Sequence, residues 1–208
     1  MNTSPKPSAY VFDHDHVPHT HKLLFPTIAQ CLKKYAIQSV LDIGCGNGYM
    51  CRHLLQHVSK VVGIDSSASG IDEARLALPE TTFHRCAIGE AHVVLKDQLF
   101  DLVLATEVIE HLFLPRELPQ LAHQHLKPRG IFILSTPYHG YWKNLALSLL
   151  NGWDRHHTVS WDGGHIKFWS RVTLEHLLKE EGFEILEFHG CGRFHYLWAS
   201  MIIVARKK

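Results

Sequence analysis

Short apolar runs alternate with longer amphipathic segments along most of this chain. Five runs have the apolar, β-rich character of buried strands, at residues 39–43, 60–64, 82–86, 100–105 and 130–135. Between them, apolar residues recur at helical spacing over residues 49–58, 67–78 and 117–126. Alternating strands and helices predict βαβ units, with a parallel sheet covered by helices on both faces.

Further elements flank this series. A leading helix is predicted over residues 19–35, helices over 141–150 and 171–181, and closing strands over 183–188 and 197–205. Residues 1–18 are polar and contain prolines, which indicates a flexible arm. The predicted fold class is therefore α/β, as one domain over residues 19–208 built on a doubly wound, seven-stranded, mostly parallel sheet.

The length and composition of the chain disfavour several classes of function. A chain of 208 residues can bury a full core as one domain. Lys and Arg number 21 against 20 Asp and Glu, and this balance disfavours a dedicated nucleic-acid binder, although a small basic patch stays open. Five cysteines without a CxxC pair disfavour a disulfide framework and a thiolate zinc site. Neither a signal peptide nor a membrane-spanning run is predicted, so we expect a cytoplasmic protein, its oligomeric state open.

The strongest local signal is a glycine-rich turn after the first predicted strand. Residues 42–48 read DIGCGNG and lead directly into a predicted helix. Glycines are needed there because side chains would keep a ligand from the backbone and because the turn needs positive φ angles. The second strand ends at Asp65, beside the turn across the sheet's switch point. A carboxylate there can accept both hydroxyls of a ribose.

Two other interpretations of this turn compete. The first is a tight strand–helix turn with a helix-capping Asp65, which the combination of loop, acid and spacing disfavours. The second is a dinucleotide site, but its GxGxxG fingerprint places the third glycine one residue later than Gly48. Asp42, two positions before Gly44, suits a ligand with a cationic amino-acid end better than a pyrophosphate.

These features resemble the class I S-adenosylmethionine-dependent methyltransferases over about residues 19–206. The resemblance rests on the glycine turn, on Asp65, and on EVIEH at 107–111, LKPRG at 126–130 and STP at 135–137. It implies a Rossmann-like methyltransferase fold with S-adenosyl-L-methionine as cofactor. Carried over by position, the cofactor site comprises Asp42, Gly44, Cys45, Gly46, Asp65, Ser66, Ala105 and Thr106. Many relatives contact adenine through an acid after the third strand, which the segment RCAI at 85–88 lacks.

The segment EVIEH suggests a metal site. A helix would place Glu107, Glu110 and His111 on one face, and such a set suits a divalent cation such as Mg²⁺. With GHIKF at 164–168, the segment resembles the small-RNA 2′-O-methyltransferases, and a similar helix occurs in the ubiquinone-biosynthesis O-methyltransferases. This resemblance implies metal ligands at Glu107, Glu110, His111 and His165. In the alternative interpretation, the same turn only orients loops by hydrogen bonding.

Aromatic and histidine residues follow the fifth strand, where relatives place substrate-specificity elements. Tyr138, Tyr141 and Trp142 are candidates for stacking on a flat acceptor, and the apolar helix face could contact lipid peripherally. For Leu145, Leu149 and Leu150, ordinary packing of the helix against the sheet is the favoured interpretation. Histidine titrates near neutral pH, so a general base is equally available at His139, His156 and His157. The catalytic candidates are Glu110, His111 and His139.

The sequence thus predicts an S-adenosylmethionine-dependent methyltransferase that O-methylates a small aromatic or quinol-like metabolite. One alternative acceptor is the 3′-terminal ribose 2′-hydroxyl of RNA, which the small size and neutral charge disfavour. Another alternative is a non-catalytic S-adenosylmethionine-binding interaction module, which the intact glycine turn and the acidic residues disfavour. The expected partner is a small-molecule methyl acceptor, whose identity lies in loops that the pattern does not specify.

Overall fold

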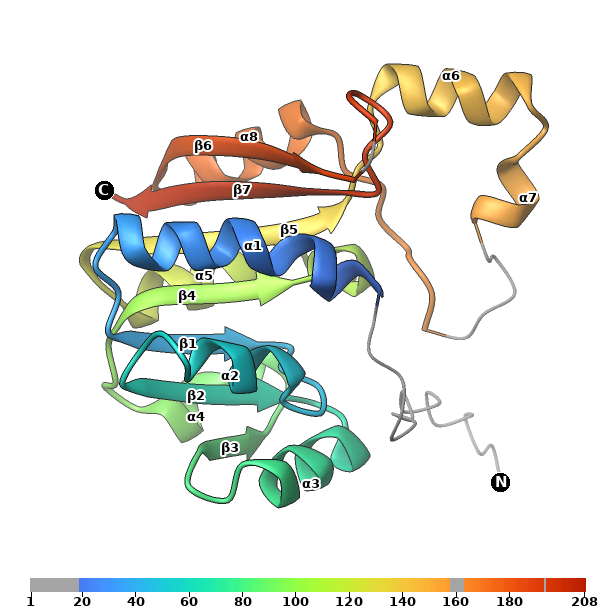
Figure 1. The fold of residues 1–208 in the computed structure, drawn as a ribbon. Coiled ribbons are helices and arrows are strands. Elements are labelled where there is room, and N and C mark those ends of the chain that lie inside the picture. Colours follow the sequence, from blue (N-terminus) through green and yellow to red (C-terminus); the bar gives the residue numbers. More distant parts are fainter. Residues whose placement is uncertain (1–18, 158–162, 193) are drawn as a thin grey trace, which may run out of the picture.

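Seven strands form one sheet, and helices cover both of its faces (Figure 1). The computed structural model describes residues 19–157, 163–192 and 194–208, so the arm predicted over residues 1–18 lies outside the described residues. The strands are β1 (Ser39–Ile43), β2 (Lys60–Asp65), β3 (Thr82–Arg85), β4 (Phe100–Thr106), β5 (Leu126–Pro137), β6 (Phe183–Cys191) and β7 (Ser200–Lys207). The α-helices are α1 (His19–Lys34), α2 (Tyr49–Leu54), α3 (Ala68–Ala77), α4 (Ala91–Leu95), α5 (Glu117–His125), α6 (Tyr141–Leu149), α7 (Trp153–His156) and α8 (Arg171–Glu180). Two 3₁₀ turns are η1 (Ile88–Glu90) and η2 (Ile109–His111).

The strand order identifies the end of the sheet where a ligand would bind. Across the sheet the order is β3-β2-β1-β4-β5-β7-β6, and β7 runs antiparallel between β5 and β6. This order confirms the predicted doubly wound, seven-stranded and mostly parallel sheet. The chain changes its direction of progress between β1 and β4, and doubly wound sheets bind ligands outside the strand ends at that point.

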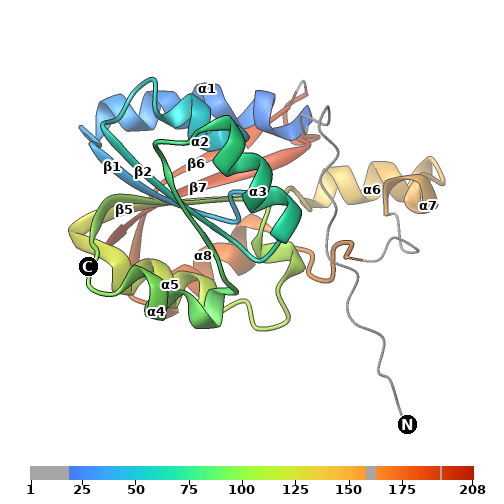
Figure 2. The same cartoon turned by 90° about the horizontal axis from the view of Figure 1, so that it is seen from below.

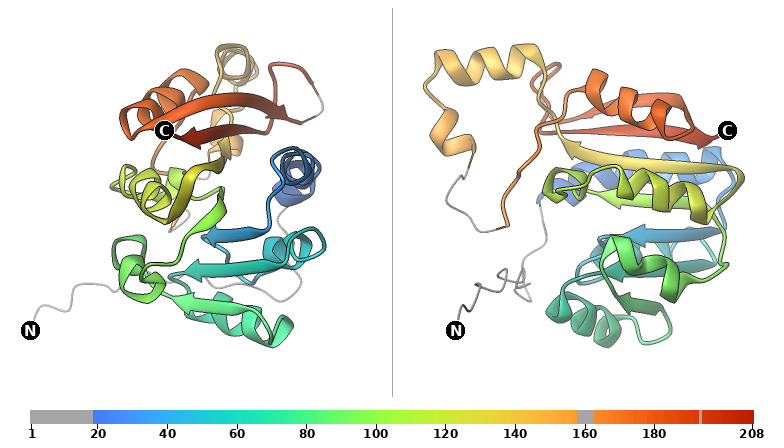
Figure 3. Two further views of the ribbon diagram at one scale, coloured as in Figure 1. Left: turned by 90° about the vertical axis from the view of Figure 1, so that its left-hand side faces the viewer. Right: turned by 180° about the vertical axis from the view of Figure 1, so that it is seen from behind.

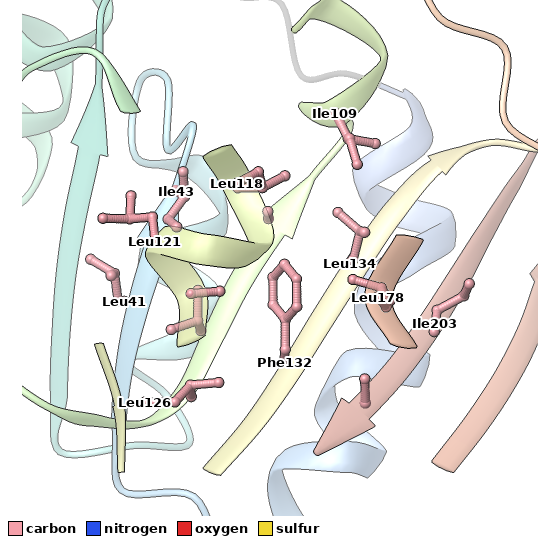
Figure 4. Close-up of a cluster of buried hydrophobic side chains, with 14 of the residues drawn as sticks. Leu41, Ile43, Ile109, Leu118, Leu121, Leu126, Phe132, Leu134, Leu178 and Ile203 are labelled. Atoms are coloured by element: carbon pink, nitrogen blue, oxygen red, sulfur yellow. The ribbon is translucent and has the colours of Figure 1, made fainter. Parts of the chain in front are cut away.

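The strands β1, β2, β4, β5 and β7 each contribute to two separate cores, because successive side chains point to opposite faces of the sheet. Leu41 and Ile43 of β1 and Phe132 of β5 lie in the core covered by α4, α5 and α8 (Figure 4). Val40 and Leu102 lie in the other core, under α1, α2 and α3. Figure 2 shows these helix layers on opposite sides of the sheet. Burial on both faces explains why the parallel strands are almost uninterrupted apolar runs in the sequence.

Three differences from the sequence prediction have local causes. The pattern does not predict α4, whose sequence AHVVL is short and contains two β-branched valines. β5 begins at Leu126 rather than at residue 130, because Leu126 pairs with Phe100 across an irregular step in the ladder. β7 begins at Ser200 rather than at residue 197, because the Trp198 ring lies over Gly190, where a Cβ would be 2.0 Å from that ring.

The helices α6 and α7, called the arm from here on, extend beyond the end of β5 (Figures 1 and 3). The chain later returns toward the sheet through residues 163–170 and enters α8. The backbone N–H groups of Ile166 and Lys167 donate to the carbonyl oxygen of Glu110 at 2.9 and 3.0 Å. These bonds fix the returning segment against the turn that follows β4.

Candidate functional site

The turn after β1 has a backbone conformation that favours glycine. Gly44, Gly46 and Gly48 have φ angles of +76°, +53° and +77°. Space also excludes a side chain at Gly44, because its Cβ would lie 2.4 Å from the Cγ2 atom of Val108. The N–H groups of Gly44 and Cys45 donate to the carbonyl oxygen of Ile64 at 2.8 and 3.1 Å. The glycine turn is therefore tied to the end of β2, as its predicted role requires.

Asp65 joins the glycine turn to the start of α3. Its Oδ2 accepts the backbone N–H of Gly46 at 2.9 Å, and its Oδ1 accepts that of Ser67 at 2.7 Å. Ser66 lies exposed in the same turn, and the Ser67 hydroxyl caps α3 by accepting the N–H of Gly70 at 3.2 Å. Each carboxylate oxygen has two lone pairs, so Asp65 keeps the capacity to accept ligand hydroxyls.

Asp42 is a buried acid beneath the glycine turn. The Cys51 thiol donates to its Oδ2 at 3.2 Å, while its Oδ1 has no hydrogen-bond partner among the described residues. Burial raises the pKa of Asp42 to about 7, and the thiol contact opposes that rise. An unpaired buried acceptor costs stability, so Asp42 is suited to receive a donor from a ligand or an ordered water molecule.

The end of β4 faces the glycine turn from the other side of the switch point. Ala105 and Thr106 are buried there and pair with Leu134 and Ser135 of β5. Glu107 follows with a φ of +55°. Its carboxylate accepts the hydroxyls of Ser135 at 2.8 Å and Ser200 at 3.2 Å, and burial raises its pKa to about 7.

Glu110, His111 and His165 come together in the next turn. One ligand atom from each lies within 4.8 Å of the others. Glu110 is buried; the Thr136 hydroxyl donates to its Oε2 at 3.0 Å, and its Oε1 has no partner among the described residues. The His111 Nδ1 lies 2.8 Å from the carbonyl oxygen of Gly163. Burial lowers the pKa of both histidines, that of His165 to about 4, and raises the pKa of Glu110.

The prediction of a helix over residues 107–111 is wrong. The structure forms only the 3₁₀ turn η2, and the positive φ of Glu107 turns the chain before it. The carboxylate of Glu107 therefore faces Ser135 and Ser200, and Glu107 is absent from the metal-competent group found among the described residues. Three of the four expected ligands meet, while the fourth takes a different position.

The residues predicted to contact the acceptor or to act as general base lie in different surroundings. His139 lies among aromatic rings, with centroids 5.6 Å from His157 and 5.1 Å from Phe168. Burial lowers the pKa of His139 to about 4 and also lowers the pKa of His156 and His157. Tyr138 is not at the surface but packs against Trp198 at 5.1 Å between ring centroids.

One residue of this region was missed by the sequence reasoning. Lys143 is the single charged residue between positions 141 and 150, and it is buried in the first turn of α6. Burial lowers its pKa to about 8, and the nearby Glu107 carboxylate opposes that shift. A lone charge in an otherwise apolar helix is the sequence signal that could have identified it.

The outer face of α6 is apolar and exposed. Tyr141 and Trp142, two of the residues proposed to stack on an acceptor, project there. Leu149 and Leu150 are 76% and 75% exposed, so the expected packing of these two leucines against the sheet is wrong. Trp142 and Leu149 line a groove of about 490 Å³ together with Tyr196 and Leu197 of the β6–β7 loop. Among the described residues, no helix combines the length and the apolar character needed to cross a membrane.

A family model described as a methyltransferase domain matches residues 15–187, which is most of the chain. The chain belongs to the methyltransferase family. The strand order and the position of Asp65 at the end of β2 agree with the resemblance to class I S-adenosylmethionine-dependent methyltransferases, and that prediction is confirmed.

Curated relatives of this chain share about a third of the aligned residues. A protein named ubiquinone biosynthesis O-methyltransferase from Bradyrhizobium diazoefficiens is 32% identical over 67% of this chain and 54% of its own length. Its counterpart from Rhodopseudomonas palustris is 33% identical over 73% of this chain and 60% of its own length. The chain thus spans little more than half the length of the curated relatives that it matches.

Solved structures share the fold of this chain at low sequence identity. The N-methyltransferase NodS from Bradyrhizobium japonicum, in complex with S-adenosyl-L-homocysteine, has a TM-score of 0.66 at 18% identity and covers 93% of this chain and 89% of its own. An S-adenosylmethionine-dependent methyltransferase from Clostridium acetobutylicum has a TM-score of 0.70 at 13% identity, over 90% and 92%. The chain therefore has the overall fold of these proteins.

Proposed function

We propose that this protein is an S-adenosylmethionine-dependent O-methyltransferase that acts on a small aromatic or quinol-like acceptor. The observation that carries the proposal is the position of Asp65. Its carboxylate holds the glycine turn and the start of α3 together at the switch point of the sheet. An acidic side chain placed there is suited to accept the hydroxyls of a ribose.

The residues around Asp65 have complementary tasks. When bound, S-adenosylmethionine supplies an electrophilic methyl group on a sulfonium. The turn containing Gly44, Cys45 and Gly46 lets the ligand approach the backbone, and Ser66 borders the ribose side. Asp42 supplies a buried carboxylate that the cationic amino-acid end would keep ionised, while Ala105 and Thr106 form the opposite wall. Holding both reactants in line accounts for most of the catalysis that methyl transfer requires.

The acceptor class is supported by the relatives and by the surface beside the site. Both curated relatives described above are named as O-methyltransferases of ubiquinone biosynthesis. The groove between α6 and the β6–β7 loop offers apolar contacts to the hydrocarbon part of an acceptor, or to lipid. His139 lies beside the ring of His157 in the arm, and it is a candidate for orienting the acceptor or removing its proton.

We also infer that Glu110, His111 and His165 can bind a divalent cation. The unpartnered, buried Oε1 of Glu110 is the observation that fits a cation, since a metal would satisfy it. One carboxylate and two imidazoles suit borderline metals such as Zn²⁺ or Fe²⁺ better than Mg²⁺. A cation there would lower the pKa of an acceptor hydroxyl.

Glu110→Gln and His165→Ala are each expected to weaken Co²⁺ binding at least about tenfold, because each removes one of three ligands. Isothermal titration with Co²⁺ alone measures the loss. The matched control is His176→Ala, which removes an exposed histidine of α8. This variant should bind Co²⁺ as the wild type does. Equal weakening by His176→Ala, or full methyltransferase activity in excess chelator, would contradict the metal inference.

The proposed function is tested by following labelled methyl from S-adenosylmethionine into a host-cell extract separated into organic-soluble and RNA fractions. Label in the organic fraction is the expected result, since a quinol-like acceptor partitions there. Label in the RNA fraction would favour the alternative acceptor, the 3′-terminal ribose hydroxyl. Absence of S-adenosylhomocysteine binding by the folded protein would overturn the cofactor assignment itself.

A further inference from the structure

Lys143 is a buried cation with few partners. Only 8% of its surface is exposed, although lysine is rarely buried unless it is paired. Among the described residues its ammonium makes one hydrogen bond, a long one of 3.4 Å to the carbonyl oxygen of Ala199. An ammonium has three donors, so two of them have no acceptor in this part of the protein. A buried donor without an acceptor is costly and suits a site completed by a ligand.

Titratable groups from the sheet, the arm and the returning segment interact electrostatically with Lys143. The carboxylate of Glu107, at the end of β4, is the anion whose charge acts on it. Its own charge acts on His139 at the end of β5, on His156 and His157 of the arm, and on His165 of the returning segment.

The imidazoles of His139, His156 and His157 are largely neutral at neutral pH, because burial and neighbouring charges lower their pKa values. The Nε2 atom of the buried His157 has no hydrogen-bond partner among the residues that the structure describes. Lys143 is therefore a buried positive charge beside these neutral rings, with the Glu107 carboxylate as the anion whose charge acts on it. Such a charge is suited to an acceptor oxygen that carries negative charge.

We propose that Lys143 is a catalytic residue that binds the hydroxyl oxygen of the acceptor as an oxyanion. The inference rests on the proposed O-methyltransferase function and deepens it, because it specifies an acceptor that ionises, such as a phenol or a catechol. The opposing charge of Glu107 and the carbonyl of Ala199 hold the ammonium in place. Lys143 stays protonated throughout and acts by charge.

The step balances without any further reactant. The acceptor O–H bond breaks and its proton passes to solvent, which leaves an oxyanion beside the ammonium. A lone pair of that oxygen forms the new O–CH₃ bond while the S–CH₃ bond of the sulfonium breaks, and its electron pair stays on sulfur as a neutral thioether. A phenol has a pKa of about 10 in water, and one nearby cation lowers such a pKa by about 1 to 3 units. Lys143 thereby increases the fraction of acceptor that is ready to react.

The test uses 4-nitrocatechol, whose visible absorption reports whether the bound probe is ionised. It is added to the full chain with S-adenosylhomocysteine, at a pH where the free probe is mostly un-ionised. The wild type is expected to show the absorption band of the ionised probe. Lys143→Met should reduce the ionised fraction at least about tenfold, and Lys143→Arg should retain most of it because the charge is kept. Lys33→Met, which removes an exposed lysine of α1, is the matched control.

Titration of S-adenosylhomocysteine into every variant separates this inference from the proposed function. Normal cofactor binding by Lys143→Met together with a wild-type probe spectrum would overturn the role of Lys143. A wild type that binds S-adenosylhomocysteine but never ionises the probe would also overturn it, while leaving the cofactor assignment in place. If Lys143→Met does not fold, Lys143→Gln against Lys143→Arg decides the question, since a merely structural contact would not follow charge.

Discussion

Asp65→Ala is expected to weaken the binding of S-adenosylhomocysteine at least about a hundredfold. A hydrogen bond to a charged group contributes about 1.5–3 kcal/mol, and the carboxylate is proposed to accept two ribose hydroxyls. The substitution also removes the acceptor that holds the N–H groups of Gly46 and Ser67, so the glycine turn loses its tie to α3. Isothermal titration of the purified variant measures the effect directly.

The control for this prediction is Asp72→Ala on α3. Asp72 is exposed and makes only a 3.7 Å surface ion pair with Arg75, so its loss should leave binding within about twofold of the wild type. Circular dichroism of both variants establishes that they are folded. An Asp65→Ala protein that is folded and binds as the wild type does would remove Asp65 from the cofactor site.

Phe132→Ala is expected to lower the free energy of unfolding by about 3–5 kcal/mol, because it leaves a cavity in the core covered by α4, α5 and α8. Phe132 is 0% exposed, and its ring packs 5.3 Å from that of Phe183 between centroids. Urea unfolding followed by circular dichroism measures the change.

The comparison for Phe132 is Phe113→Ala, at a side chain that is 84% exposed. That substitution should change the free energy of unfolding by no more than about 0.5 kcal/mol. Similar losses for the two variants would mean that the core described here does not carry the stability of the sheet.

The strands and most helices could be predicted because a two-sided sheet imposes a strong pattern on the sequence. β1 is confirmed to the residue at Ser39–Ile43, since all five of its side chains are buried. α6 and α8 each end one residue before their predicted limits. The short α4 and α7 were missed because helices of five and four residues contain too little periodicity to recognise.

The parts of the candidate site that depend on the local backbone could be predicted from the sequence. The parts that depend on contacts between residues far apart in the chain could not. The glycine turn and Asp65 are specified by residues close together in the sequence. Glu107 was misplaced because Ser200, which holds one of its oxygens, lies 93 residues away. Lys143 was missed because its surroundings form only when the arm meets the strand ends, which spacing along the chain does not show.

The position of β7 has a consequence for how this protein is made. β7 occupies the interior of the sheet between β5 and β6, although it follows both of them in the chain. While the protein is being translated, β5 and β6 therefore have unpaired edges until residues 200–207 have emerged from the ribosome. Unpaired strand edges promote aggregation. A nascent chain that pauses before Ser200 is therefore the species that most needs protection by a chaperone.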